Sequence, residues 1–428
     1  MPLPRTFWRF AAASGASNLA DGVFQVALPL AALQLTRSPL LVAGVSFAAG
    51  LPWLLFALVA GVVVDRVDRR RLMAACSAVR SVVIALVAVL LVVGALALWH
   101  LYLAALVLGT VETLFDSAAQ SVLPMVVPAD RLTAANSRLY GVEVTGQVFA
   151  GPPLGGLLAG VALALAATSS AVLYAAVAVL LLTLPGRFRA DRAPGATGGS
   201  GARGVAALRG DVTEGVRYLW AAPTLRRLAL LTGGSTLVSN VTFSVLALFA
   251  VAPGPMGLTE TGYGVFLAAS GVGAVLASLV AERVVARLGP ARSVRLALLV
   301  FAAMVASPLL VRPVAVAVVQ AFGAAAVVVY NVVAVSYRQR VVPAQLLGRV
   351  NSAYRVLAWG GIPVGAALGG VLAHLVGLRG AFAVAGLAAL VLVAGTRGLT
   401  DEQLTAAEPA GPTQPTGPTG PAGLERRT

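Results

Sequence analysis

The chain has 428 residues, of which 59% are apolar and only 11% are charged, against roughly 25% charged residues in an ordinary soluble domain. A soluble protein of this length covers its surface with charge, so the composition excludes an ordinary soluble enzyme and favours a surface that faces a lipid bilayer. The formal net charge is +15 and every basic residue is arginine, but the arginines stand between apolar runs, so we expect no nucleic-acid partner.

Twelve apolar runs are each long enough for a transmembrane helix, which needs about 20 mostly apolar residues. The first run continues past the polar residues Asn18 and Asp21, so it is too long and too polar for a signal-peptide core and we interpret it as a retained helix. In chain order the expected helices cover residues 10–34, 40–64, 73–97, 99–124, 137–163, 167–185, 226–250, 262–281, 293–311, 313–336, 351–376 and 379–397.

A polar stretch separates the sixth and seventh expected helices. It contains a segment rich in Gly, Ser and Ala at 193–201, typical of a flexible linker, and a short amphipathic helix follows at 211–220. The Pro-, Thr- and Gly-rich tail has too few large apolar residues to fold. We therefore predict an N-terminal six-helix bundle at 1–185, a cytoplasmic linker at 186–224, a C-terminal six-helix bundle at 225–399 and a disordered cytoplasmic tail at 400–428.

The arginines predict the orientation of the chain. With both termini in the cytoplasm, the outer loops hold only Arg37, Arg312 and Arg379, and the other 28 of the 31 basic residues lie on the inner side. Positive charge in cytoplasmic loops is the normal pattern of membrane proteins. We therefore expect a multi-pass protein of the cell membrane with both ends inside.

An internal repeat supports the division into two halves. Residues 126–137 read VVPADRLTAANS and residues 341–352 read VVPAQLLGRVNS, so seven of twelve positions agree at an offset of 215 residues. Each copy precedes a Gly- and Pro-rich apolar helix, the fifth of its half. Parallel halves of this kind are one known transporter architecture.

Two motifs carry a resemblance to a known family. Residues 61–71 read GVVVDRVDRRR, after the second expected helix. This resembles the signature G-x-x-x-D-R-x-x-R-R of the major facilitator superfamily, and the loop after the eighth helix holds a degraded copy. Residues 151–156 read GPPLGG, which is similar to the G-P-x-x-G-G core that antiporters of this superfamily carry in the fifth helix.

The resemblance implies an all-α membrane protein with twelve transmembrane helices in two pseudo-symmetric six-helix bundles. Such a protein usually works as a monomer, needs no cofactor and is a transporter rather than an enzyme. The alternatives are that the arginines only anchor the topology and that the fifth helix merely kinks at its proline. The resemblance assigns a cytoplasmic gate to Gly61, Asp65, Arg66, Arg69 and Arg70, and a hinge in the fifth helix to Gly151, Pro152, Gly155 and Gly156.

The fourth helix departs from the best-known drug exporters of the superfamily. Those proteins often carry an arginine there, whereas this chain has Glu112 and Asp116. The first helix reads NLADG at 18–22 and LPL at 28–30, which looks more like the bacterial efflux branch that includes macrolide and siderophore exporters.

Placing a charged side chain in the middle of the bilayer costs at least ~2.5–3.5 kcal/mol on insertion scales. We therefore expect charged residues inside the expected helices to have a function. Asp21 lies in the middle of the first helix, and Glu112 and Asp116 share one face of the fourth. In the superfamily these helices line the central cavity, so we expect Asp21, Glu112 and Asp116 to couple transport to protons. We expect Arg80 and Glu143 to form a buried ion pair, with Asp116 as an alternative partner of Arg80.

The C-terminal half carries only neutral polar groups in the middle of its helices. Such groups either contact a substrate or hold neighbouring helices together by hydrogen bonds. The candidate substrate-cavity residues are Asn18, Gln25, Asn240, Gln320, Tyr330 and Asn331.

The leading function is proton-coupled export of a small, drug-like organic molecule by alternating access. Uptake of a nutrient by the same fold is the first alternative, followed by a membrane protein that does not transport and by a lipid-modifying enzyme. The sequence shows no metal-ligand spacing, no nucleophile with a nearby base and no phosphate-binding loop. It therefore predicts no metal site and disfavours both the enzyme and ATP-driven transport.

Overall fold

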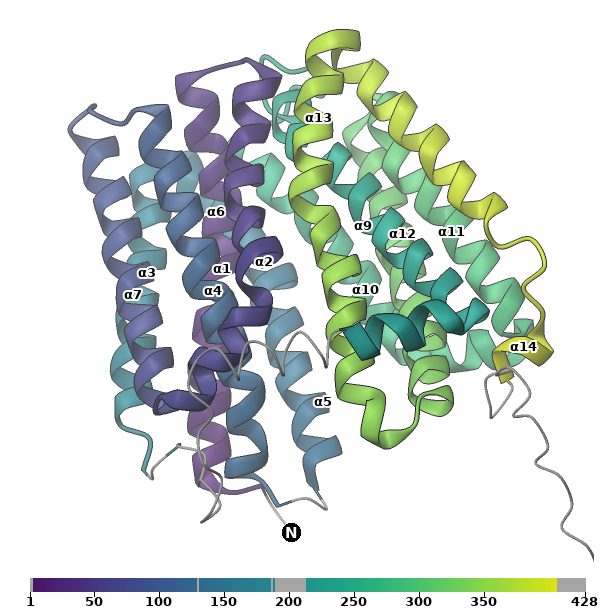
Figure 1. The fold of residues 1–428 in the computed structure, drawn as a ribbon. Coiled ribbons are helices and arrows are strands. Elements are labelled where there is room, and N and C mark those ends of the chain that lie inside the picture. Colours follow the sequence, from purple (N-terminus) through teal and green to yellow (C-terminus); the bar gives the residue numbers. More distant parts are fainter. Residues whose placement is uncertain (1–2, 129–130, 186–187, 189–212, 406–428) are drawn as a thin grey trace, which may run out of the picture.

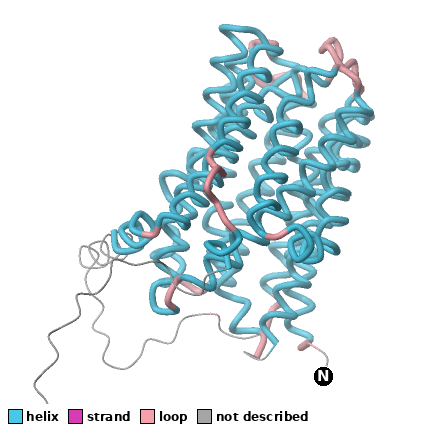
Figure 2. The backbone as a smooth tube through the Cα atoms, turned by 90° about the vertical axis from the view of Figure 1, so that its right-hand side faces the viewer, coloured by secondary structure: helices cyan, strands magenta, loops and turns pink. Residues whose placement is uncertain are grey.

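The computed structural model describes residues 3–128, 131–185, 188 and 213–405, and the side chains at 57–62, 65, 66, 124, 133, 344 and 345 lie outside this description. Nearly all described residues are helical (Figures 1 and 2). The predicted disordered tail at 406–428 and the Gly-rich part of the linker lie outside the described residues.

The N-terminal helices, α1–α7, pack against one another on one side of the molecule (Figure 1). Most are long and apolar, and short turns connect them. Their bounds are α1 Arg5–Leu35, α2 Pro39–Arg66, α3 Arg69–Val92, α4 Leu98–Val126, α5 Leu132–Glu143, the π-helical segment η2 Val144–Ala150, α6 Gly151–Val161 and α7 Leu163–Leu182.

The C-terminal helices, α9–α13, lie beside the first group (Figure 1). A short helix at 213–221 precedes them, and a helix of five residues, α14, follows them. Their bounds are α9 Pro223–Ala250, α10 Glu260–Leu288, α11 Pro290–Ala306, the 3₁₀ segment η3 Ser307–Leu310, α12 Pro313–Val341, α13 Ala344–Ala394 and α14 Asp401–Thr405.

Ten helices of the described chain are long and apolar enough to cross a membrane. The expected fifth helix is not among them, because α5, η2 and α6 divide it. The expected eleventh and twelfth helices are joined in α13, which changes direction at Gly377, where φ is +77°. The all-helical architecture agrees with the sequence, whereas the count of twelve spans and the domain boundaries stay predictions.

The bulge in the expected fifth helix lies close before a proline. The seven residues of η2 are π-helical, and Pro152 is the second residue of the regular helix α6. Proline has no N–H to donate and its ring clashes with the preceding turn, so the chain relaxes there by widening. The sequence predicted an irregularity at this place but not its π-helical form.

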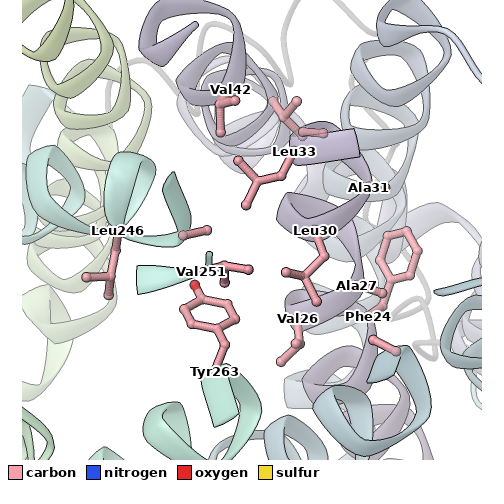
Figure 3. Close-up of a cluster of buried hydrophobic side chains, with 14 of the residues drawn as sticks. Phe24, Val26, Ala27, Leu30, Ala31, Leu33, Val42, Leu246, Val251 and Tyr263 are labelled. Carbon is pink, nitrogen blue, oxygen red and sulfur yellow. The ribbon is translucent and has the colours of Figure 1, made fainter. Parts of the chain in front are cut away.

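The two groups of helices share one apolar core at one end of the molecule, which we call the closed end. Figure 3 shows this cluster, in which Leu30 of α1 lies opposite Leu246 of α9 and Tyr263 of α10. The loops at 36–38 and 251–259 mark the closed end, where Arg37 donates a hydrogen bond to the carbonyl of Ala252.

At the opposite end, which we call the open end, the apolar cores are separate. One cluster contains only residues up to 188, among them Phe7, Met73 and Leu181. Another contains only residues from Leu219 onward. The two halves therefore adhere at the closed end and keep their own cores at the open end.

Glycines allow the helices of the two halves to touch. A Cβ atom on Gly156 of α6 would lie 2.7 Å from the Cα atom of Gly264 of α10. On the other side of the molecule, a Cβ on Gly50 of α2 would lie 2.8 Å from the Ile362 side chain of α13. Such distances leave no room for a larger residue, as in closely packed membrane helices.

A helix at 213–221 lies near the expected helical segment 211–220. Leu219 is buried in the core of the C-terminal helices. Tyr218 donates a hydrogen bond to the carbonyl of Val341 over 3.1 Å, and Glu214 forms an ion pair with Arg349. This helix therefore packs on the open end of the C-terminal group.

Candidate functional site

Two cavities lie side by side in the middle of the molecule. The acidic cavity, of about 250 Å³, lies among the N-terminal helices and is lined by Asp21, Arg80, Glu112 and Tyr174. The central cavity, of about 410 Å³, lies between the two halves. Gln25, Leu28, Ala49 and Glu112 line both cavities, and Glu112 is the one residue of the four with an ionisable side chain.

The acidic cavity contains a buried ion pair. Asp21 of α1 lies 3.5 Å from Arg80 of α3, and the side chains are 24% and 3% exposed. Tyr174 of α7 donates a hydrogen bond to the Asp21 carboxylate and accepts one from Arg80 over 3.4 Å. Three helices that are distant in sequence are therefore joined by one network of charged and polar groups.

Aromatic rings cover the guanidinium group of Arg80. Its central carbon lies 5.2 Å from the centre of the Phe115 ring and 5.3 Å from that of Tyr174. Cation–π contacts and the carboxylate together offset the loss of water around the charge. A buried arginine therefore persists in the centre of a helix bundle.

Glu112 and Asp116 follow one another by one turn on α4, and both are half-buried. Both act electrostatically on Arg80, and so does Asp21. Arg355 of α13, from the other half, acts on Asp116. The middle of the molecule thus gathers three carboxyl groups around one fully buried guanidinium.

The expected ion pair between Arg80 and Glu143 is not formed. The carboxylate that pairs with Arg80 is Asp21, and Glu143 is exposed at the end of α5. Helical spacing placed both residues near one end of the membrane, but it contains no information about which helices α3 faces. Packing of α3 against α7 and α4 turns Arg80 away from α5.

The central cavity combines aromatic, amide and carboxyl side chains. Three of its lining residues, Trp53, Phe243 and Tyr263, are aromatic. Gln25 and Asn240 add amide groups, and Asn240 donates to the carbonyl of Thr236 over 2.8 Å. The lining therefore suits a largely apolar molecule that carries a few polar groups or a positive charge.

A third cavity, of about 250 Å³, lies within the C-terminal helices and contains Tyr330 and Asn331. The Tyr330 hydroxyl donates to the carbonyl of Leu228 over 2.8 Å and lies 3.0 Å from the Thr232 hydroxyl. The structure places these two expected substrate residues away from the central cavity.

Two other expected cavity residues form hydrogen bonds within the protein. Gln320 bonds to a neighbouring helical segment, and Asn18 bonds within its own helix. Gln320 is buried and donates to the carbonyl of Met304 and to the Ser307 hydroxyl, each over 3.4 Å. Asn18 donates to the carbonyl of Ser14, one turn before it, over 2.8 Å. Neither residue is among those that line the central cavity.

Two tryptophans meet where the central cavity borders the open end. The ring centres of Trp53 of α2 and Trp359 of α13 are 3.9 Å apart, at an angle of 70°. Arg355 lies one turn from Trp359 with its guanidinium carbon 4.8 Å from that ring. Trp53, Trp359 and Arg355 thus connect the two halves on the side of the central cavity that faces the open end.

Of the expected cytoplasmic gate, the structure describes the side chains of Arg69 and Arg70. The side chains of Asp65 and Arg66 and the surroundings of Gly61 lie outside the described part of the chain. Arg69 donates to the sulfur of Met125 over 3.2 Å, and Arg70 donates to the carbonyl of Leu184 over 2.5 Å. These bonds join α3 to α4 and to the end of α7, within the N-terminal helices.

The glycines of the fifth-helix motif are packing positions. A Cβ on Gly151 would lie 2.6 Å from the Cα atom of Gly22, and one on Gly155 would lie 2.6 Å from the carbonyl oxygen of Val23. Gly156 faces Gly264, across the boundary between the halves. This helix therefore contacts both α1 and α10 without intervening side chains.

Sequence reasoning missed Tyr174, Gln147 and the aromatic residues of the central cavity. Tyr174 had a usable signal, because a tyrosine in an Ala- and Leu-rich span needs a partner for its hydroxyl. Among the described residues, no group of three His, Cys, Asp or Glu side chains is arranged to hold a metal ion.

Known proteins match this chain over nearly its whole length. A family model described as transmembrane secretion effector, within the major facilitator superfamily, matches residues 2–409. The multidrug efflux pump Tap of Mycolicibacterium fortuitum is 30% identical over 400 residues, which cover 89% of this chain and 91% of Tap.

Solved structures show the same fold. A mutant of the nucleoside transporter NupG superposes with a TM-score of 0.72 at 12% identity, covering 92% of this chain and 99% of NupG. A bacterial homologue of the iron transporter ferroportin in its inward-facing state gives a TM-score of 0.68 at 16% identity, covering 95% and 100%. The all-helical fold and the family expected from the sequence are thereby confirmed, and the chain belongs to the major facilitator superfamily as a multi-span membrane transporter of its bacterial efflux branch.

Proposed function

We propose that this transporter exports an amphipathic, positively charged organic molecule in exchange for protons. The observation that carries the proposal is the position of Glu112, which lines both the acidic cavity and the central cavity. A carboxyl group at this junction can exchange a proton for a cation in the central cavity. The similarity to a protein named a multidrug efflux pump supports export of organic molecules.

The charge balance supports coupling to protons. If Asp21, Glu112 and Asp116 were all ionised, Arg80 and Arg355 would leave one negative charge without a counterion in the middle of the molecule. An unpaired charge in a poorly solvated site is costly. Binding of either one proton or one cationic substrate removes this cost, so the two ligands should compete.

The arginine distribution supports the orientation. With the open end in the cytoplasm, most arginines stand on the cytoplasmic side, as the positive-inside rule expects. The central cavity would then be closed to the outside by the shared apolar core that includes Leu30, Leu246 and Tyr263. Alternating access would require this core to separate while the two halves approach each other at the open end.

Transport by purified protein in liposomes tests the proposal. An imposed pH gradient should drive a lipophilic cationic dye in the direction opposite to proton flow. Glu112→Gln should abolish the dependence on the gradient, whereas Glu282→Gln, an exposed carboxylate at the end of α10, should retain it. Full coupling in Glu112→Gln, or dye movement along with protons, would show that the proposal is wrong.

A further inference from the structure

An apolar groove runs along the outside of the C-terminal helices. Its volume is about 520 Å³, and it is formed by α10, α11 and α12, which pack against one another. Ser293 is the one polar residue among the described residues that line it. A concave site of this size is within the range of ligand sites.

The two ends of the groove differ. At one end α10 and α12 touch, since a Cβ on Gly273 would lie 1.8 Å from the carbonyl oxygen of Ala321. From Val272 the groove follows α10 to Leu288, a length of about 24 Å at 1.5 Å per residue. It therefore begins near the middle of α10 and ends at the open end of the molecule.

This length corresponds to one leaflet of a bilayer. The hydrocarbon core is about 30 Å thick, so one leaflet contributes about 15 Å and the headgroup region lies beyond it. A lipid in the leaflet at the open end would place its acyl chain along Leu276 and Val280 and its phosphate near Leu288.

Arginines stand at the mouth of the groove. Arg283 follows the groove residue Leu279 by four positions, and Arg287 follows Val284 by three. Residues three or four apart share one face of a helix, so both arginines lie on the groove face of α10. Arg292 precedes Leu296 by one turn on the opposite wall.

Within the described part of the chain, no carboxylate pairs with these arginines. Arg283, Arg287 and Arg292 are exposed, and none of the three forms an ion pair with a described residue. Glu282 is exposed and forms no ion pair with a described residue, and Asp401 accepts a hydrogen bond from the backbone N–H of Ala291 over 2.8 Å.

We propose that the groove is a binding site for one anionic phospholipid of the leaflet at the open end. An acyl chain fills the apolar groove, and the phosphate is held by Arg283, Arg287 and Arg292. Any lipid could cover an apolar face, but a groove one leaflet long that ends at three arginines without a described carboxylate partner selects a negative headgroup. Guanidinium groups bind phosphate with strong, charge-assisted hydrogen bonds.

Native mass spectrometry of the detergent-solubilised transporter tests this site. The probes are phosphatidylglycerol and phosphatidylcholine with identical acyl chains. We expect one tightly held phosphatidylglycerol, preferred over phosphatidylcholine, and a loss of affinity of about fivefold for each of Arg283→Gln and Arg287→Gln. Arg9→Gln, an exposed arginine on α1, is the matched control and should bind lipid like the wild type.

A second variant tests the apolar part of the site. Ala325 lines the groove, so Ala325→Phe should reduce the binding of both lipids, whereas Ala85→Phe, at an exposed position on α3, should not. Equal binding of the two lipids, or equal loss in the control variants, would overturn the proposal. Displacement by glycerol phosphate alone would indicate a bare phosphate site, and one-for-one displacement by the cationic dye would assign the groove to the substrate's route.

Discussion

Asp21 and Arg80 form an ion pair with a distance of 3.5 Å between α1 and α3, and Tyr174 of α7 bonds to both. Removal of one partner from a buried pair leaves an uncompensated charge, which typically destabilises a protein by 3–5 kcal/mol. This pair therefore has a structural role that must be separated from any role in coupling.

We predict that Arg80→Gln lowers the thermal unfolding temperature more than the double variant Asp21→Asn/Arg80→Gln does. The double variant removes both charges of the ion pair, so it should recover most of the stability that Arg80→Gln loses, whereas we expect proton coupling to be lost in both variants. Unfolding in detergent and dye transport in liposomes measure the two effects separately. If the double variant were as unstable as Arg80→Gln, charge would not be the cause.

The Trp53–Trp359 contact should contribute to the association of the halves. Edge-to-face aromatic pairs contribute about 0.5–1.5 kcal/mol beyond the area they bury, and these rings meet at 3.9 Å and 70°. A double-mutant cycle with Trp53→Leu and Trp359→Leu should give a coupling energy in this range, measured by thermal unfolding. A coupling energy of zero would mean that the rings do not interact in the membrane protein.

Close packing of α6 on α10 gives a third prediction. A Cβ on Gly156 would overlap the backbone at Gly264, whereas a Cβ on Gly141 of α5 meets nothing within 4 Å. Gly156→Val should therefore force the halves apart at the closed end and abolish transport, while Gly141→Ala should be neutral or slightly stabilising. Gradient-driven dye transport measures both, and unimpaired transport by Gly156→Val would contradict the packing.

The sequence predicted most helices because the length of an apolar run, and the residues that interrupt it, can be recognised locally in the sequence. Gly377 lies between the expected helices 351–376 and 379–397, and the structure turns there. Asp21 and Glu112 were singled out by their cost in a membrane, and both line the acidic cavity. The partner of Arg80 was predicted wrongly, because the choice between Asp21 and Glu143 depends on which helices become neighbours.

The helix at 213–221 supplies the last prediction, which contrasts two kinds of contact. Glu214 and Arg349 form an ion pair, but their side chains are 39% and 40% exposed. An exposed pair of this kind contributes about 0–1 kcal/mol, since water and salt screen it. Leu219, in contrast, is 0% exposed in the core of the C-terminal helices.

We therefore expect Glu214→Gln to change the unfolding temperature little, whereas Leu219→Ala should cost about 2–5 kcal/mol through lost burial and the cavity it leaves. Proteolysis at 213–221 should accelerate in Leu219→Ala alone, because the helix would detach from the ends of α12 and α13. A larger effect of Glu214→Gln would show that the ion pair, rather than apolar burial, holds this helix on the C-terminal half.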